Sequence, residues 1–147
     1  MFGIVRHTLA AMVILSLGSL SAERAPGQVR KDAVASYDPG KGRALYGTHC
    51  SACHGANGEG LPGTFPPIKG SGVVTKDDAT KHIHVVLNGA QGGRAGGVLY
   101  ASPMPAFGGI LSDAEIADII DYERSSWGNH GKLVTAVQVA AERDHPK

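Results

Sequence analysis

Two cysteines and a histidine at close spacing are the residues of this 147-residue chain best suited to chemistry. Cys50, Cys53 and His54 form a Cys-x-x-Cys-His motif, and the chain has no other cysteine. Two thiols at this spacing can each add to a vinyl group on one porphyrin edge, and the adjacent histidine can then ligate the iron. The motif therefore predicts one covalently bound haem c, attached at Cys50 and Cys53, with His54 as an axial iron ligand.

Two other uses of a Cys-x-x-Cys pair compete with haem attachment. A thioredoxin-like redox pair normally lies in a strand–helix setting, whereas the residues before Cys50 have helical spacing. A zinc site needs further Cys or His at ligand spacing. His82 and His84 are the candidate zinc ligands, but they fall on different faces of a predicted helix. Both alternatives fit the sequence less well than haem.

A methionine is the candidate for the second axial ligand. Met104 lies between two prolines, and the other two methionines belong to the predicted N-terminal leader. The flanking prolines exclude a helix and hold an extended loop, which can present the thioether to a metal. A lone methionine often only fills a gap in a core, and His82 or His84 is the alternative ligand. His49, on the helix before the motif, is expected to face solvent.

Helices are expected to position these residues. Four segments have the start and the apolar spacing of a helix: residues 38–50, 77–88, 112–127 and 135 onward. The last two begin with a capping box, and no segment has the alternation of a strand. The connecting stretches are rich in Gly and Pro, and such long loops are uncommon without a function. The sequence predicts an all-α fold of three or four helices with long loops wrapped around one cofactor.

The N-terminus has the features of an export signal. Arg6 and His7 precede an apolar run that ends at Leu20, and small residues follow it. This pattern is typical of a secretory signal, and the run is short for a membrane span. We expect residues 1–22 to be a signal peptide, or an N-terminal anchor if it is retained, and residues 23–36 to be a linker. The mature protein is then expected in the periplasm, with no membrane span unless the signal is retained.

Composition restricts the size and the partners of the folded part. Residues 37–130 are expected to form one domain, followed by a tail, 131–147, with a short helix. The chain has 21 glycines and only 5% aromatic residues, which suits a loop-rich chain around an apolar cofactor. A formal net charge of +1 gives no indication of nucleic-acid or membrane-surface binding.

With the motif and the helices in place, residues 38–129 resemble the mono-haem class I cytochrome c family, in its bacterial periplasmic branch. Residues 100–107 are similar to the methionine loop of that family, and residues 122–129 are similar to the helix ending of the branch. The resemblance implies the cytochrome c fold. It also implies that Gly42 and Tyr46 pack across the last long helix.

Three further site residues follow from the resemblance. Pro66 is similar to the family proline whose backbone carbonyl accepts a hydrogen bond from the axial histidine. That bond orients the imidazole and raises its basicity. Ile68 and Tyr100 are implied as residues that pack beside the haem.

Two filled axial positions leave no site for a substrate, so the sequence predicts outer-sphere electron transfer and not an enzyme. A free periplasmic carrier is the preferred role. A dedicated haem c subunit of a membrane-linked dehydrogenase or oxidase complex is the alternative, and a gas sensor or haem enzyme would require Met104 to be labile. Val134, Val137 and Val139 of the tail could serve the subunit role by docking on a partner, or could pack on the parent domain.

The expected partners are redox proteins: a dehydrogenase, a cytochrome complex or a terminal oxidase. From Ser36 onward the chain has ten Lys and Arg against eleven Asp and Glu. This balance predicts no lysine-rich docking ring, and partners that depend on one are not expected.

Overall fold

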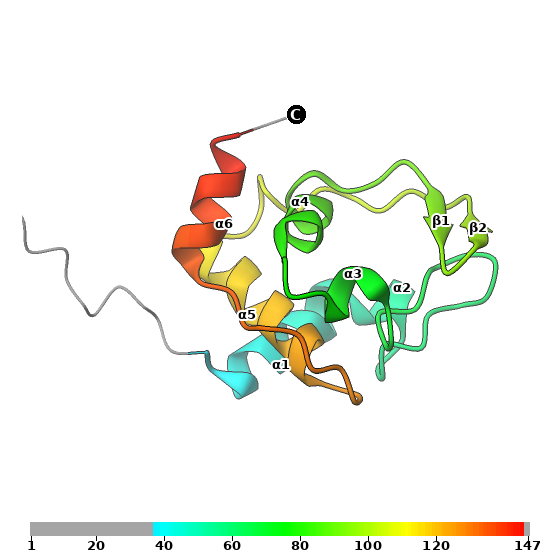
Figure 1. Ribbon diagram of the computed structural model, residues 1–147, viewed down its shortest axis with the longest axis horizontal. Coiled ribbons are helices and arrows are strands. Elements are labelled where there is room, and N and C mark those ends of the chain that lie inside the picture. Colours follow the sequence, from blue (N-terminus) through cyan, green and yellow to red (C-terminus); the bar gives the residue numbers. More distant parts are fainter. Residues whose placement is uncertain (1–36, 146–147) are drawn as a thin grey trace, which may run out of the picture.

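The computed structural model describes residues 37–145, so the predicted signal peptide and linker, 1–22 and 23–36, lie outside the described residues. Helices and two short strands follow one another along this part of the chain. The helices are α1 Pro39–His49, α2 Ser51–His54, α3 Gly72–Thr75, α4 Thr80–Asn88, α5 Asp113–Ser125 and α6 Ala136–Arg143, and the strands are β1 Gly93–Ala95 and β2 Val98–Tyr100. The α6 helix and the β1–β2 hairpin lie at opposite ends of the molecule (Figure 1). Within residues 37–145, no helix is long and apolar enough to cross a membrane.

The helix starts follow the side chains that the sequence offers as caps. Asp38 accepts hydrogen bonds from the backbone of the first turn of α1. Ser112 and Glu115 form a complete capping box at α5, and Thr135 and Gln138 form another at α6. Each cap satisfies backbone N–H groups that the helix leaves without partners. The helices predicted at 38–50, 112–127 and 135 onward are confirmed by these starts.

The α1 and α5 helices pack directly on each other (Figure 1). Gly42 permits the close approach, because a Cβ at this position would overlap the backbone oxygen of Asp118. Tyr46 is 2% exposed, and its ring centroid lies 5.4 Å from that of Tyr122 and 5.0 Å from that of Trp127. The predicted packing of Gly42 and Tyr46 across the last long helix is confirmed.

The tail packs on the domain. The α6 helix contacts α5 and α4, and Val134 and Val139 are buried while Val137 is 65% exposed. Arg143 fixes the end of α6 by donating to the carboxylate of Asp113 at 2.8 Å and to the carbonyl of Gly108. Two of the three tail valines are therefore part of the domain's own core.

The expectation that no segment forms a strand is wrong for the glycine-rich loop. Arg94 pairs with Leu99 in a two-stranded antiparallel hairpin of β1 and β2. Gly96 and Gly97 form its turn with φ values of 57° and 83°, which is the left-handed backbone that a two-residue hairpin turn requires. Strands of three residues are too short for alternation to reveal them, and the Gly-Gly pair was the available signal.

Two helix boundaries also differ from the sequence expectation, and two short helices were not expected. The α5 helix ends at Ser125, because Ser126 is extended, and Trp127 follows in the left-handed region with a φ of 55°. The α4 helix begins at Thr80, after a turn in which the side chain of Asp78 accepts a hydrogen bond from the Thr80 backbone. The short α2 and α3 helices were not predicted, since four residues carry no detectable periodicity.

Candidate functional site

A cavity of about 360 Å³ brings together the residues that the sequence proposed as a cofactor site. A volume of this size falls in the range of small-molecule and cofactor sites. The wall is formed by the α1–α2 junction, the loop before α3, helix α4, and the segment that leads from β2 toward α5. All seven proposed site residues line it: Cys50, Cys53, His54, Pro66, Ile68, Tyr100 and Met104.

The two cysteines lie on one helical turn at the edge of this cavity. Cys50 caps α1 and starts α2, and its carbonyl accepts hydrogen bonds from the backbone of Cys53 at 3.2 Å and of His54 at 3.0 Å. The cysteines form no disulfide; Cys50 is buried and Cys53 is exposed. Both thiols are therefore free to form thioethers.

The surroundings of the thiols do not suit zinc. Burial raises the pKa of the Cys50 thiol, which disfavours the thiolate that a metal ion needs as ligand. Among residues 37–145, no three His, Cys, Asp or Glu side chains come together as a metal cluster. The pair thus lacks the further ligands of a structural zinc site.

The His54 imidazole has a fixed orientation. Its Nδ1 lies 2.8 Å from the carbonyl oxygen of Pro66, so Nδ1–H donates and Nε2 remains available as a ligand. This is the hydrogen bond that the resemblance implied for Pro66. Short backbone bonds hold the loop between the two residues: Gly60 donates to His54 at 2.8 Å, and Ile68 donates to Gly58 at 2.9 Å.

Met104 is held by backbone bonds to the end of α4. Its N–H donates to the Ala90 carbonyl at 2.8 Å, and the Ala90 N–H donates back at 3.0 Å. Phe107 extends the attachment by donating to Val86 at 3.0 Å. Gly89 makes room for it, because its φ is 70° and a Cβ would overlap the Met104 carbonyl oxygen. Met104 therefore lines the cavity from a segment that backbone hydrogen bonds attach to α4 and to Ala90 just after it.

Apolar side chains line much of the rest of the cavity. Ile68, Val86, Tyr100, Phe107 and Ile119 line it and are all buried. The expectation that His49 faces solvent is wrong: it is half-buried, lines the cavity, and packs its ring edge-on to Phe107 at 6.0 Å. Its contact with Phe107 turns it inward.

The two histidines of α4 have carboxylate partners that the sequence analysis missed. His82 Nε2 lies 2.7 Å from Glu123 Oε2, and both side chains are buried and line the cavity. His84 Nε2 lies 2.7 Å from Glu142 Oε2 on the other side of the helix. The two residues do fall on different faces of α4. A glutamate on the apolar face of α5 was the signal for the first pair.

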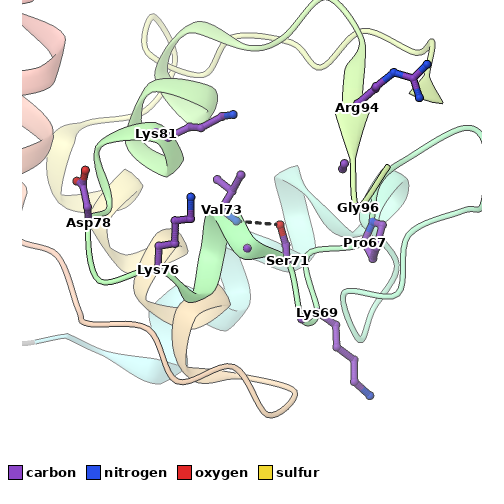
Figure 2. Close-up of a pocket in the computed structure, with 12 residues that line it drawn as sticks. Pro67, Lys69, Ser71, Val73, Lys76, Asp78, Lys81, Arg94 and Gly96 are labelled. Carbon is purple, nitrogen blue, oxygen red and sulfur yellow. Dashed lines mark hydrogen bonds between the residues drawn. The ribbon is translucent and has the colours of Figure 1, made fainter. Parts of the chain in front are cut away.

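The cavity opens toward a cluster of cations. Lys81 and Arg94 line both the cavity and an adjoining pocket of about 390 Å³, which also contains Lys69 and Lys76 (Figure 2). Asp78 is the one acidic residue that lines this pocket. The overall balance of charge in the sequence hid this local excess of positive charge.

The cavity fits haem c in three respects. It is apolar over much of its wall, it presents two free thiols and an oriented imidazole, and its cationic end suits the two carboxylates of a porphyrin. The cytochrome c family model matches residues 40–127. Fold and site therefore define a haem c electron-transfer module, and the chain belongs to the cytochrome c family. Its cofactor is one covalently bound haem c.

Similar proteins include both enzyme subunits and a small cytochrome. The chain is 35% identical over 142 residues to the gluconate 2-dehydrogenase cytochrome c subunit of Pantoea cypripedii, covering 92% of this chain and 32% of that protein. It is 34% identical over 104 residues to the alcohol dehydrogenase (quinone) cytochrome c subunit of Gluconacetobacter polyoxogenes, covering 70% of this chain and 22% of that protein. Cytochrome c-552 of Thermus thermophilus is 34% identical over 96 residues, covering 63% of this chain and 72% of that protein. The chain thus spans about a third or less of the two dehydrogenase subunits.

Proposed function

We propose that this cytochrome is a periplasmic electron carrier whose haem is attached at Cys50 and Cys53 and whose iron is ligated by His54 and Met104. The observation that carries the proposal is that His54 and Met104 line the same cavity. The Nδ1 of His54 is hydrogen-bonded to the Pro66 carbonyl, which leaves Nε2 available as a ligand. A His/Met pair stabilises the ferrous iron relative to a His/His pair.

Bound in this cavity, the haem supplies an iron that accepts and releases one electron. The chain's own residues keep that exchange outer-sphere. The Pro66 carbonyl holds the proton of the His54 Nδ1, which fixes the imidazole and raises its basicity. Met104 would occupy the second ligand position of the iron, which would leave none for a substrate. Ile68 and Tyr100 exclude water, and Lys81 and Arg94 are placed to neutralise the porphyrin carboxylates.

Absorption spectroscopy of the ferric protein tests the ligand assignment. We expect a thioether-to-iron(III) charge-transfer band that disappears in Met104→Ala. The band should persist in His82→Gln and His84→Gln, which are the matched controls for the competing histidine ligands. A band that survives in Met104→Ala, or that is absent from the unmodified protein, would refute Met104 as ligand.

A dedicated subunit of a dehydrogenase or oxidase complex is the second candidate role. It is favoured by the 92% of this chain that aligns with a dehydrogenase subunit. The carrier role is favoured by the match that covers 72% of cytochrome c-552. Extraction from the native host at high salt separates the two: a carrier is released alone into the periplasmic fraction, and a subunit stays with a dehydrogenase or oxidase.

A further inference from the structure

Two ionisable side chains lie buried in the cavity wall without a role in haem attachment or ligation. His82 of α4 and Glu123 of α5 are hydrogen-bonded at 2.7 Å, and their side chains are only 5% and 4% exposed. Both line the cavity. Burying charged groups is costly unless they are paired, so a histidine–glutamate pair in this wall calls for an explanation.

Four basic side chains line the same cavity as this pair, namely His49, His54, Lys81 and Arg94, and few other titratable groups lie near it. From α1, Tyr46 and Cys50 lie near Glu123, and burial keeps both neutral by raising the pKa of each. From α5 itself, Asp121 lies near His82. Among the described residues, His82 is the one basic side chain within salt-bridge distance of Glu123.

The neighbouring charged groups have partners of their own. Arg124 of α5 donates to the carbonyls of Lys132 and Lys76. From α6, Glu142 pairs with His84, and α3 carries no titratable side chain. These contacts leave His82 and Glu123 as each other's side-chain partners.

The pair can hold one proton or two. With one proton shared at Nε2, it carries a net charge of −1; with two protons, it carries none. The Nδ1 atom of His82 is buried and has no hydrogen-bond partner within residues 37–145, so it is the atom that receives the second proton. A net charge in such surroundings responds strongly to any other charge in the same cavity, because little water screens it.

Reduction of the haem iron adds one negative charge to that cavity. We propose that the His82–Glu123 pair is a proton-binding site coupled to this reduction, so that the cytochrome takes up a proton together with its electron. The proposal rests on the function proposed above. In the coupled step, one electron from the donor reduces Fe(III) to Fe(II), and one proton from water enters at His82 Nδ1. Oxidation releases both, and no other bond is made or broken.

The chain contains a matched control for this site. The His84–Glu142 pair has the same 2.7 Å separation, but its side chains are 14% and 25% exposed and neither residue lines the cavity. Solvent screens an exposed pair far more than a buried one. Coupling to the iron is therefore expected from the first pair and not from the second.

The test is the midpoint potential of the holoprotein, measured by spectroelectrochemical titration between about pH 5 and pH 9, the range in which histidines change charge. We expect the potential to fall as pH rises, with a slope of up to about 59 mV for each tenfold drop in proton concentration. The double variant His82→Gln/Glu123→Gln keeps an amide hydrogen bond in place of the ion pair. It should lose this slope, while His84→Gln should keep it.

A second measurement needs no variant. Reduction of the unbuffered holoprotein with a pH indicator present should consume protons, up to one for each electron, within the pH range of the slope. A flat potential together with no proton uptake would overturn the proposal. A slope that persists in the double variant would overturn it too, and would assign the proton to another group, either Asp121 or a porphyrin carboxylate near Lys81 and Arg94. The absorption band of the ferric protein tests separately whether Met104 is a ligand, so a failure of the proposed function can be told apart from a failure of this proposal.

Discussion

The two ligand-bearing sides of the haem cavity are built in different ways. On the histidine side, residues 50–68, local bonds dominate: His54 bonds to a carbonyl twelve residues ahead, and the loop between them closes on itself. On the methionine side, residues 89–107, Met104 and Phe107 bond back to Ala90 and Val86, across the β1–β2 hairpin. In the proposed assignment, the histidine side also carries the covalent links, at Cys50 and Cys53. We infer that substitutions on the histidine side can release the haem, whereas substitutions on the methionine side remove only one ligand of the iron.

The largest expected effect is the loss of covalent haem from the histidine side. In the double variant Cys50→Ala/Cys53→Ala, no thioether can form, so mass spectrometry of the denatured protein should show the mass of the chain without haem. Met104→Ala is the control on the other side, and it should retain the full haem mass. If Met104→Ala lost covalent haem as well, the two sides would not be independent.

The methionine side can be broken without touching its ligand. Gly89→Ala places a Cβ against the Met104 carbonyl oxygen at a residue with a φ of 70°. We expect the thioether-to-iron(III) band to be lost or strongly reduced, while the haem stays covalently bound. Left-handed backbone alone costs about 1–2 kcal/mol for a residue with a side chain, and the overlap adds to that cost.

Gly63→Ala is the matched control for this variant. Gly63 has a φ of 73°, and its Cβ would meet nothing within 4 Å. It should therefore show the cost of the backbone alone and keep the absorption band. Equal spectra for the two variants would show that Gly89 does not position the methionine loop.

The same contrast explains how much of the site could be predicted from the sequence. The histidine side could be predicted, because the motif and Pro66 lie close together along the chain and are joined by short-range hydrogen bonds. On the other side Met104 could be found, but the backbone pairing with Ala90 could not. Likewise Glu123 lies 41 residues from His82. A glutamate on the apolar face of α5 indicates that some buried partner exists. Which residue becomes that partner is decided by the packing of the helices, and one sequence does not show it.

The lysines and the arginine near the cavity, and the inward orientation of His49, also depend on contacts between distant segments. Lys69, Lys76, Lys81 and Arg94 come from the loop before α3, the end of α3, α4 and β1, and only the fold gathers them around the pocket that adjoins the cavity. His49 was expected to face solvent because its own helix gave no reason for burial. Its contact with Phe107 of the methionine side decides its direction.

A third prediction concerns the helix that carries the histidine side. The Tyr46 hydroxyl of α1 donates to the Gly55 carbonyl at 2.6 Å, next to the motif. Gly42→Ala pushes α1 away from α5, since its Cβ would overlap the Asp118 carbonyl oxygen. We expect a loss of about 3 kcal/mol in the free energy of unfolding, the upper range for overpacking in a core, measured by denaturant titration.

Gly47→Ala on the same helix is the control, because nothing lies within 4 Å of its Cβ. It should stabilise the protein by up to about 1 kcal/mol through helix propensity. If Gly42→Ala were as stable as Gly47→Ala, the close contact of α1 with α5 would not be needed to hold the histidine side.

The smallest effect concerns the scaffold that both sides share. Burial raises the pKa of Asp121 on α5 from 3.8 to about 6, although its carboxylate accepts a hydrogen bond from the Val134 backbone at 2.7 Å. A raised pKa means that this group contributes stability below pH 3.8, which is lost as pH rises through 6. At pH 7 the folded protein therefore bears an unfavourable buried charge.

Asp121→Asn removes that charge and keeps an oxygen for the Val134 N–H. We expect the variant to be more stable than the unmodified protein by about 2 kcal/mol at pH 7, somewhat less than the full shift corresponds to, since an amide oxygen is the weaker acceptor. The difference should shrink toward pH 4, where the carboxyl of the folded protein is already protonated. Denaturant titrations at both pH values measure it, and a difference that does not change with pH would show that Asp121 is not the group that titrates.

Because Asp121 lies on α5 and lines neither side of the cavity, haem attachment and the thioether band should be unchanged. The variant thus separates the stability of the shared scaffold from the two modes of holding the iron.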